Sequence, residues 1–366
     1  MKLRIAAVLA TLFFLPQAHA LTPADEPLVK VVEKTRPAVV NIYSERVVQR
    51  QVADPFDQFF GRYYNVRQKL STLGSGVLIS PDGYIVTCAH IVGRADDKGK
   101  IKVVLTDGTS LPAQLLDADE DADLALLKVD AKKPLPYLSL APADLSPNLL
   151  GETVVAIGDP IGYQSSVSSG ILSAKERRVE TSDGPIEGLL QTDAAINPGN
   201  SGGALVDIEG KFVGLSNAKT TGAGIESIGF AIPGAKVGAW AADAIAIAKG
   251  EKPAPKPVPL TDIVRDRFGL GLQAVTPELA EAFGLPSTSG LLVSDVVKGS
   301  PAAAVGIPTG VLLVQVGTVP IVDTDSLPRQ LRGVKPGDSV SFTIATVKRQ
   351  GAFVLRNSQA VTLKAR

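Results

Sequence analysis

Short apolar runs separated by turn residues constrain this chain most, and they fill its middle section from Gly74 to Ile232. Pro81-Asp82-Gly83 and Asp107-Gly108 lie between apolar runs, and such pairs are typical of hairpin turns. The chain has 35 glycines and 26 prolines without a collagen-like period, which also favours turns over long helices. We therefore expect a mostly β fold, a barrel or a sandwich, across this section. The predicted strands cover residues 76–80, 84–87, 101–105, 124–129, 154–157, 211–216 and 228–232.

A proline-rich segment marks the clearest domain boundary. Prolines alternate at positions 253, 255, 257 and 259, and this spacing is typical of a semi-rigid polyproline linker. An alanine-rich helix, predicted over residues 235–249 with Gly250 as its C-terminal cap, precedes the linker. The predicted divisions are a signal peptide at residues 1–20, a first domain at 21–250, the linker at 251–260 and a second domain at 261–366.

Three segments have less regular patterns. Residues 49–71 mix charged and aromatic side chains and fit neither a strand nor a helix period, so we expect a long loop there. In the second domain, Thr276 followed by Pro277 predicts the start of a short helix. A second short helix is expected near residues 326–332, although a helix tolerates Pro328 only in its first turn.

The N-terminus has the pattern of a secretory signal peptide. Lys2 and Arg4 precede an apolar run over residues 5–15, and Ala18-His19-Ala20 fits a small-residue cleavage site. The run is too short to span a bilayer comfortably, although an uncleaved anchor is the alternative. Cleavage after Ala20 implies export to the periplasm or to the outside, and it leaves His90 as the only histidine.

Composition excludes several classes of function. Basic and acidic residues balance at 37 each. Because a nucleic-acid-binding protein needs a basic surface, we expect no nucleic-acid partner. The chain lacks a phosphate-binding Gly-x-x-x-x-Gly-Lys-[Ser/Thr] motif, so we expect no nucleotide. One cysteine cannot form an internal disulfide or a cysteine-based zinc site, and two histidines disfavour a multi-histidine centre. We therefore expect neither a metal nor another cofactor.

Ser201 lies in the most informative stretch, Asn197-Pro198-Gly199-Asn200-Ser201-Gly202-Gly203. A nucleophilic hydroxyl needs a tight turn that lets substrate approach, with backbone N–H groups that converge on the attacked carbonyl oxygen. Gly199 permits backbone conformations that residues with a Cβ avoid. The N–H groups of Gly199 and Ser201 could therefore form an oxyanion hole. The same stretch also fits a plain turn.

His90 and Asp123 could complete a catalytic set. His90 follows a hydrophobic strand and is the one candidate general base of the exported chain near neutral pH. Asp123 precedes an apolar strand, where a buried carboxylate could accept the histidine Nδ1–H and fix its tautomer. Either residue could instead be structural or solvated. The chain order His, Asp, Ser on a β-rich background is that of a chymotrypsin-type triad.

Longer segments around these residues resemble the HtrA/DegP family of periplasmic serine endoproteases. The resemblance covers most of residues 27–250, including the aromatic stretch 54–60, which is similar to an N-terminal insertion of that family. One departure is Cys88-Ala89, which replaces the pairs often found before the histidine. The segments that carry the resemblance are residues 74–90, 123–127, 155–162, 191–205 and 228–233.

The resemblance implies a chymotrypsin-like double β-barrel with the active site between the barrels. It assigns His90 as general base, Asp123 as the residue that orients it, and Ser201 as nucleophile, with Gly199 and Ser201 in the oxyanion hole. A serine-type endopeptidase that forms an acyl-enzyme follows from these roles. Because the base must be neutral, we expect activity to fall below about pH 6–7.

Substrate preference can be predicted coarsely. Ala195 stands six residues before the nucleophile, at the floor of the first pocket in trypsin-like folds, and Ile196 lies beside it. No acidic residue occurs there to attract Lys or Arg. Leu215 and Ser216 would form another wall. We therefore expect cleavage after small aliphatic residues such as Val or Ala.

The second domain contains the segment Gly269-Leu270-Gly271-Leu272, and this segment resembles the carboxylate-binding loop of a PDZ domain. This predicted peptide-binding loop would hold a terminal carboxylate with backbone N–H groups, beside a sheet edge that accepts an extended peptide. A simple glycine turn is the alternative, and the strand after Gly310 lacks the Gly-Asp pair usual in such domains.

We expect an ATP-independent endoprotease that degrades misfolded or unfolded exported proteins under regulation by the PDZ domain. Its expected partners are unfolded polypeptides and peptide C-termini. The family resemblance also implies a homotrimer or a higher multiple of it. The alternative is a chaperone or PDZ scaffold with an idle protease fold.

Overall fold

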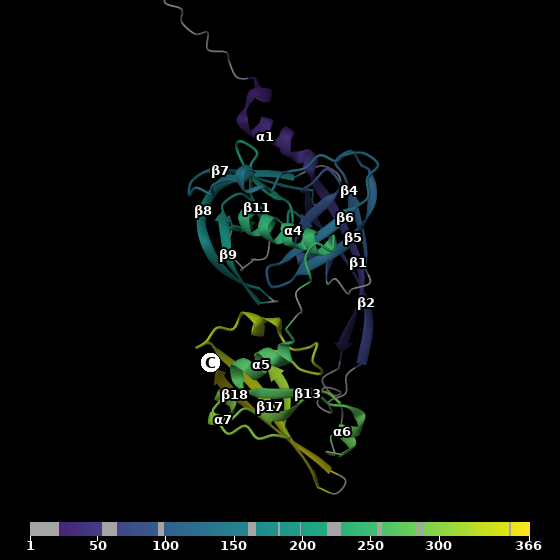
Figure 1. Cartoon of the computed structure of the whole chain (residues 1–366), viewed down its shortest axis with the longest axis vertical. Coiled ribbons are helices and arrows are strands. Elements are labelled where there is room, and N and C mark those ends of the chain that lie inside the picture. Colours follow the sequence, from purple (N-terminus) through teal and green to yellow (C-terminus); the bar gives the residue numbers. More distant parts are fainter. Residues whose placement is uncertain are drawn as a thin grey trace, which may run out of the picture.

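The computed structural model describes residues 22–52, 64–93, 99–159, 166–181, 184–197, 199–217, 228–254, 258–282, 285, 288–350 and 353–366. The predicted signal peptide and the aromatic residues 54–60 lie outside the described residues. Figure 1 shows two adjoining barrels and, beyond them, a separate C-terminal sheet. In the described part of the chain, no helix has both the length and the apolar character needed to cross a membrane.

Six antiparallel strands close the first barrel in the order β1-β2-β3-β6-β5-β4. Apolar side chains such as Ile42, Ile85 and Leu126 are fully buried in it. Gly76 allows close packing, because a Cβ there would lie 2.7 Å from Ile42 Cδ1 and 2.8 Å from Ile85 Cγ2. The strands are β1 (Val39–Val52), β2 (Tyr64–Leu78), β3 (Tyr84–Thr87), β4 (Lys100–Val104), β5 (Ser110–Asp119) and β6 (Leu124–Val129).

Strands β1 and β2 continue beyond the barrel as a long hairpin, which Figure 1 shows reaching toward the C-terminal sheet. Their pairing is unbroken from Val39 opposite Val77 to Val52 opposite Tyr64. The loop predicted for residues 49–71 is therefore wrong for 49–52 and 64–71, which are strand. A strand shows alternating hydrophobicity only where one face is buried against a core, and cross-strand backbone pairing does not need it.

Six antiparallel strands also close the second barrel, in the order β10-β11-β12-β9-β8-β7. The predicted strands at 154–157, 211–216 and 228–232 correspond to β7, β11 and β12. The mostly β fold and the double barrel are thus confirmed. The strands are β7 (Thr153–Gly158), β8 (Ser166–Thr181), β9 (Gly184–Thr192), β10 (Ala204–Asp207), β11 (Phe212–Asn217) and β12 (Gly229–Pro233).

Helix α4 (Gly234–Ala248) joins the two barrels, because it contacts β11 and β12 of the second and β5 and β6 of the first. Val237, Ala241 and Ala244 are buried and lie on one face of the helix, as their spacing of three and four requires. This helix confirms the one predicted over 235–249. The other short helices before the C-terminal sheet are η1 (Pro23–Asp25), α1 (Pro27–Thr35), η2 (Arg36–Ala38), α3 (Ala89–Val92) and η3 (Pro142–Asp144).

The C-terminal unit is a sheet with strand order β13-β14-β15-β17-β18, and β16 pairs with β15. Phe268 and Phe342 meet edge to face in its core, with ring centroids 4.9 Å apart. Its elements are α5 (Leu260–Phe268), β13 (Leu270–Ala274), α6 (Pro277–Ala282), β14 (Leu291–Val296), α7 (Pro301–Ala304), β15 (Leu312–Val316), β16 (Val319–Pro320), η4 (Arg329–Gly333), β17 (Ser339–Gln350) and β18 (Phe353–Lys364).

One of the two short helices expected in this unit differs from its prediction. Helix α6 begins at Pro277, and Thr276 Oγ1 accepts the Leu279 N–H at 3.3 Å, as predicted for its N-cap. Residues 326–332 instead form a turn followed by the 3₁₀ helix η4, with Pro328 at its N-cap. Proline has no N–H and restricts the residue before it, so an α-helix cannot run through Leu327.

Two ion pairs join the C-terminal unit to the barrels. Lys335 Nζ lies 2.9 Å from Glu187 Oε2 on β9, and Arg332 Nε lies 3.8 Å from Asp121 Oδ2 in the turn before β6. Burial raises the pKa of the Asp121 carboxyl, and Arg332 opposes that shift. Both pairs come from the segment around η4.

Candidate active site

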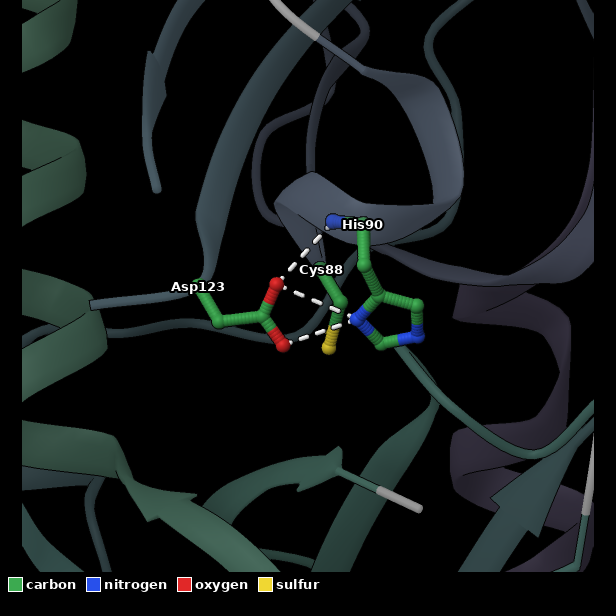
Figure 2. A group of neighbouring side chains, drawn as sticks. All are labelled: Cys88, His90 and Asp123. Carbon is green, nitrogen blue, oxygen red and sulfur yellow. Dashed lines mark hydrogen bonds and ion pairs between the residues drawn. The ribbon is translucent and has the colours of Figure 1, made fainter. Parts of the chain in front are cut away.

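His90 lies on α3, a single helical turn that follows β3. Ala89, Ile91 and Val92 on the same turn are buried, which fixes the backbone and leaves the imidazole 26% exposed. His90 Nδ1 lies 2.8 Å from Asp123 Oδ2 and 3.1 Å from Asp123 Oδ1 (Figure 2). An ionised carboxylate can only accept, so Nδ1 donates and Nε2 is the acceptor nitrogen of the neutral ring.

Asp123 stands just before β6, with its side chain 1% exposed. Its φ of 56° is uncommon for a residue other than glycine, although aspartate tolerates it better than most. The backbone is held in place because the Ala89 N–H donates to the Asp123 carbonyl at 3.2 Å. The His90 N–H also donates to Asp123 Oδ1 at 3.0 Å. The turn that carries His90 and the turn that carries Asp123 are therefore bonded directly to each other.

Asn217, at the end of β11, supplies another donor to the same carboxylate. Its Nδ2 donates to Asp123 Oδ2 at 2.9 Å, and the residue is 1% exposed. Asn217 is not among the site residues predicted from the sequence. No local signal could have identified it, because Asn217 and Asp123 are 94 positions apart and meet only where the barrels pack.

The turn that carries Ser201 is tied to the first barrel. The Ser75 N–H donates to the Ser201 carbonyl at 2.9 Å, and Ser75 Oγ donates to the Gly199 carbonyl at 2.6 Å. Gly202 has a φ of +79°, and a Cβ there would lie 2.2 Å from the Ser75 carbonyl and 2.5 Å from Thr87 Oγ1. The glycine thus lets the turn of Ser201 pack against β2 and the end of β3, close to the turn of His90.

Two features of this turn bear on the predicted oxyanion hole. Gly199 has a φ of 100°, a conformation that glycine adopts without strain. Ser201 is 6% exposed. The N–H groups of Gly199 and Ser201 both belong to this turn, and their role as oxyanion donors stays a prediction.

Cys88 connects the histidine turn with the second barrel. It is fully buried, and its Sγ lies 3.5 Å from the Ser216 carbonyl. The Gly202 N–H donates to the same carbonyl at 2.8 Å. The last two residues of β11 therefore contact all three predicted catalytic segments. Asn217 contacts Asp123, and Ser216 contacts Cys88 and Gly202.

Residues 74–215 match the family described as a trypsin-like peptidase domain. Three similar proteins are each named a probable periplasmic serine endoprotease, DegP-like, from Pseudomonas fulva, Hahella chejuensis and Chlamydia pneumoniae. They are 36%, 38% and 37% identical over 93%, 86% and 80% of this chain, which spans 72%, 66% and 60% of their own lengths. The chain belongs to the DegP-like family of serine endoproteases.

A solved structure supports the same assignment. The HtrA-type protease AlgW, in a serine-to-alanine variant with a decapeptide, is 32% identical and matches with a TM-score of 0.51. The match covers 92% of this chain and 96% of that structure. The predicted family and the predicted enzyme class, a serine-type endopeptidase, are thus confirmed for this DegP-like chain.

The predicted specificity residues of the DegP-like chain have different exposures. Ala195 is exposed and Ile196 is half-buried, on the segment between β9 and the nucleophile turn. Leu215 and Ser216 have no exposed surface. They can only back a pocket from behind, and the pocket itself stays a prediction.

The predicted peptide-binding loop lies between α5 and β13. Gly269 ends α5 in the left-handed conformation, and its N–H donates to the Arg265 carbonyl at 2.9 Å. Leu270, Gly271 and Leu272 begin β13, which stands at one end of the strand order. A strand in this position has one edge on which an extended peptide could pair. Peptide binding stays a prediction.

Proposed function

We propose that this chain is an ATP-independent endoprotease that degrades misfolded or unfolded exported proteins in the periplasm. Ser201 acts as nucleophile, His90 as general base and Asp123 as the residue that orients His90. The observation that carries the proposal is the 2.8 Å contact between His90 Nδ1 and the buried Asp123 carboxylate. The similar proteins are named periplasmic endoproteases, which supports this location.

The proposed reaction follows from the hydrogen bonds of the imidazole. With Nδ1 donating to Asp123, Nε2 takes the proton of Ser201 Oγ as the oxygen attacks the substrate carbonyl. The Gly199 and Ser201 N–H groups stabilise the oxyanion, and one such donor contributes about 10²–10³ in rate. His90 then protonates the leaving amine. Water hydrolyses the acyl-enzyme with the same base.

Substrate selection would involve both parts of the chain. Ala195 and Ile196 favour cleavage after Val or Ala, and a peptide library cut mainly after Lys or Arg would contradict this. The C-terminal unit would act as a PDZ domain that captures exposed peptide C-termini at Gly269–Leu272 and presents them to the protease. Residues 1–20 would direct export, and the mature chain would form a homotrimer or a higher multiple.

Digestion of casein tests the central proposal. Wild type should degrade it without ATP, and Ser201→Ala should lower the rate by about 10⁶-fold. Ser173→Ala is the matched control, because Ser173 is an exposed serine on β8 and should be replaceable without loss. Absence of digestion by wild type, even with activating peptides, would favour the chaperone or scaffold alternative.

A further inference from the structure

The proposed base, His90, lies close to two other side chains that can ligate a metal, Cys88 and Asp123. One ligand atom of each residue lies within 4.8 Å of the other two: the Cys88 Sγ, a ring nitrogen of His90 and a carboxylate oxygen of Asp123. Figure 2 shows the sulfur next to the contact between the carboxylate and the imidazole. We propose that these three residues form a binding site for a thiophilic divalent cation such as Zn²⁺, and that its occupancy switches the protease off.

The donor set fits zinc chemistry. Thiolate, imidazole and carboxylate are the three kinds of ligand that Zn²⁺ takes from proteins, at about 2.0–2.3 Å each. The 2.8 Å between His90 Nδ1 and Asp123 Oδ2 need open only by roughly 0.5 Å to reach the ligand spacing of a tetrahedral ion. The counts of cysteine and histidine exclude a metal site built only from cysteines and disfavour one built only from histidines. They do not exclude a mixed site.

Asn217 offers a further oxygen at the same place. Its Oδ1 is buried and has no hydrogen-bond partner in the part of the chain that the structure describes. The same amide already contacts Asp123 through Nδ2. A buried oxygen without a hydrogen-bond partner destabilises the fold. If the Asn217 amide turned over, its Oδ1 would face Asp123 and would gain a cation held there as its partner. The partly exposed imidazole of His90 marks the side from which an ion could enter.

Metal binding and catalysis would exclude each other. A neutral imidazole carries one N–H, so a metal on Nδ1 moves that proton to Nε2. His90 Nε2 then donates and can no longer accept the proton of Ser201. Cys88 binds as the thiolate, and its proton passes to solvent. The inhibition rests on the proposed roles of His90 and Ser201, whereas the binding site itself does not.

Binding can be measured without activity. Co²⁺ is titrated into the full chain carrying Ser201→Ala, which prevents self-digestion, and near-ultraviolet absorbance reports thiolate-to-cobalt charge transfer. We expect a saturable absorbance band. The band should be lost when Zn²⁺ displaces Co²⁺, and it should be absent from the double variant that carries Cys88→Ser as well as Ser201→Ala. Saturation without a band would overturn the proposal, because the ion would then bind elsewhere. This titration decides the site even if the chain cleaves no substrate.

Inhibition supplies the second measurement. Zn²⁺ should inhibit peptide cleavage reversibly, and EDTA should restore the rate. The concentration for half-inhibition should rise at least tenfold in both Cys88→Ser and Cys88→Ala, each compared with its own rate without metal. The serine variant keeps a hydroxyl near the Ser216 carbonyl and guards against a packing defect. Equal sensitivity of wild type and both variants would contradict the proposal.

Discussion

Asp123 places a charge where the fold excludes water, and its donors decide whether that charge is tolerated. A buried carboxylate is strongly destabilising unless it is paired and hydrogen-bonded. Asp123 accepts from the His90 backbone N–H, from His90 Nδ1 and from Asn217 Nδ2. Two donors come from the first barrel and one from the second. The orientation of the carboxylate therefore depends on how the barrels pack, which assigns Asn217 a positioning role.

Asn217→Ala should lower kcat more than it raises KM. The substitution removes one hydrogen bond to a charged group, a loss of about 1.5–3 kcal/mol, which corresponds to roughly 10- to 100-fold in rate. Steady-state kinetics on a short peptide measures the effect. Asn41→Ala is the matched control, because Asn41 is another buried asparagine between the barrels and donates to the Asp159 carbonyl. Equal losses of kcat in both variants would reduce Asn217 to a packing role.

At the level of elements, the nucleophile turn depends on glycine for two separate reasons. Gly202 combines a positive φ with close contacts to Ser75 and Thr87. Gly202→Ala should therefore abolish labelling of Ser201 by a fluorophosphonate. The loss of stability should exceed the roughly 1–3 kcal/mol of backbone strain alone, because the added Cβ also meets the Ser75 carbonyl. Both are measured on the same sample, by labelling and by thermal unfolding.

The Gly151→Ala variant separates the effect of backbone strain from the effect of a steric clash. Gly151 also has a positive φ, of +84°, but an added Cβ would meet nothing within 4 Å. We expect a loss of stability of about 1–3 kcal/mol, from backbone strain alone, with full labelling of Ser201. A Gly202→Ala protein that labels like this control would show that the contacts with Ser75 and Thr87 do not position the turn.

The sequence predicted these elements where the pattern was local. Apolar runs and Asp-Gly turns predicted the barrel strands, and the Thr276-Pro277 pair predicted the start of α6. The outer part of the β1–β2 hairpin escaped prediction because its strands pair through the backbone without apolar alternation. Pro328 prevented the helix expected near residue 326. The contacts of Asn217 and Cys88 with the other barrel arise only from tertiary packing, so no pattern along the chain predicts them.

The segment around η4 connects the C-terminal unit to the active-site region. Arg332 contacts Asp121, two residues before Asp123, and Lys335 contacts Glu187 on β9. Each pair is at least half open to solvent and salt on its carboxylate or ammonium side, and a single pair of this kind contributes little. Together the two ion pairs could fix one arrangement of the C-terminal unit and the barrels. Reversing the charge of one partner should then disturb that arrangement.

Lys335→Glu should loosen that arrangement and enlarge the molecule. The hydrogen bond from Lys335 is the main cause that lowers the pKa of the Glu187 carboxyl. The contact should therefore be complete above pH 4.5, the ordinary pKa of glutamate, and should be lost only as pH falls through the lowered pKa.

Small-angle scattering of Ser201→Ala protein at pH 7 and low salt should give a larger radius of gyration with Lys335→Glu. Adding Glu187→Lys should restore the radius, whereas Lys298→Glu, an equal charge change on the same unit, should not alter it. A radius insensitive to Lys335→Glu would show that this pair does not hold the units together.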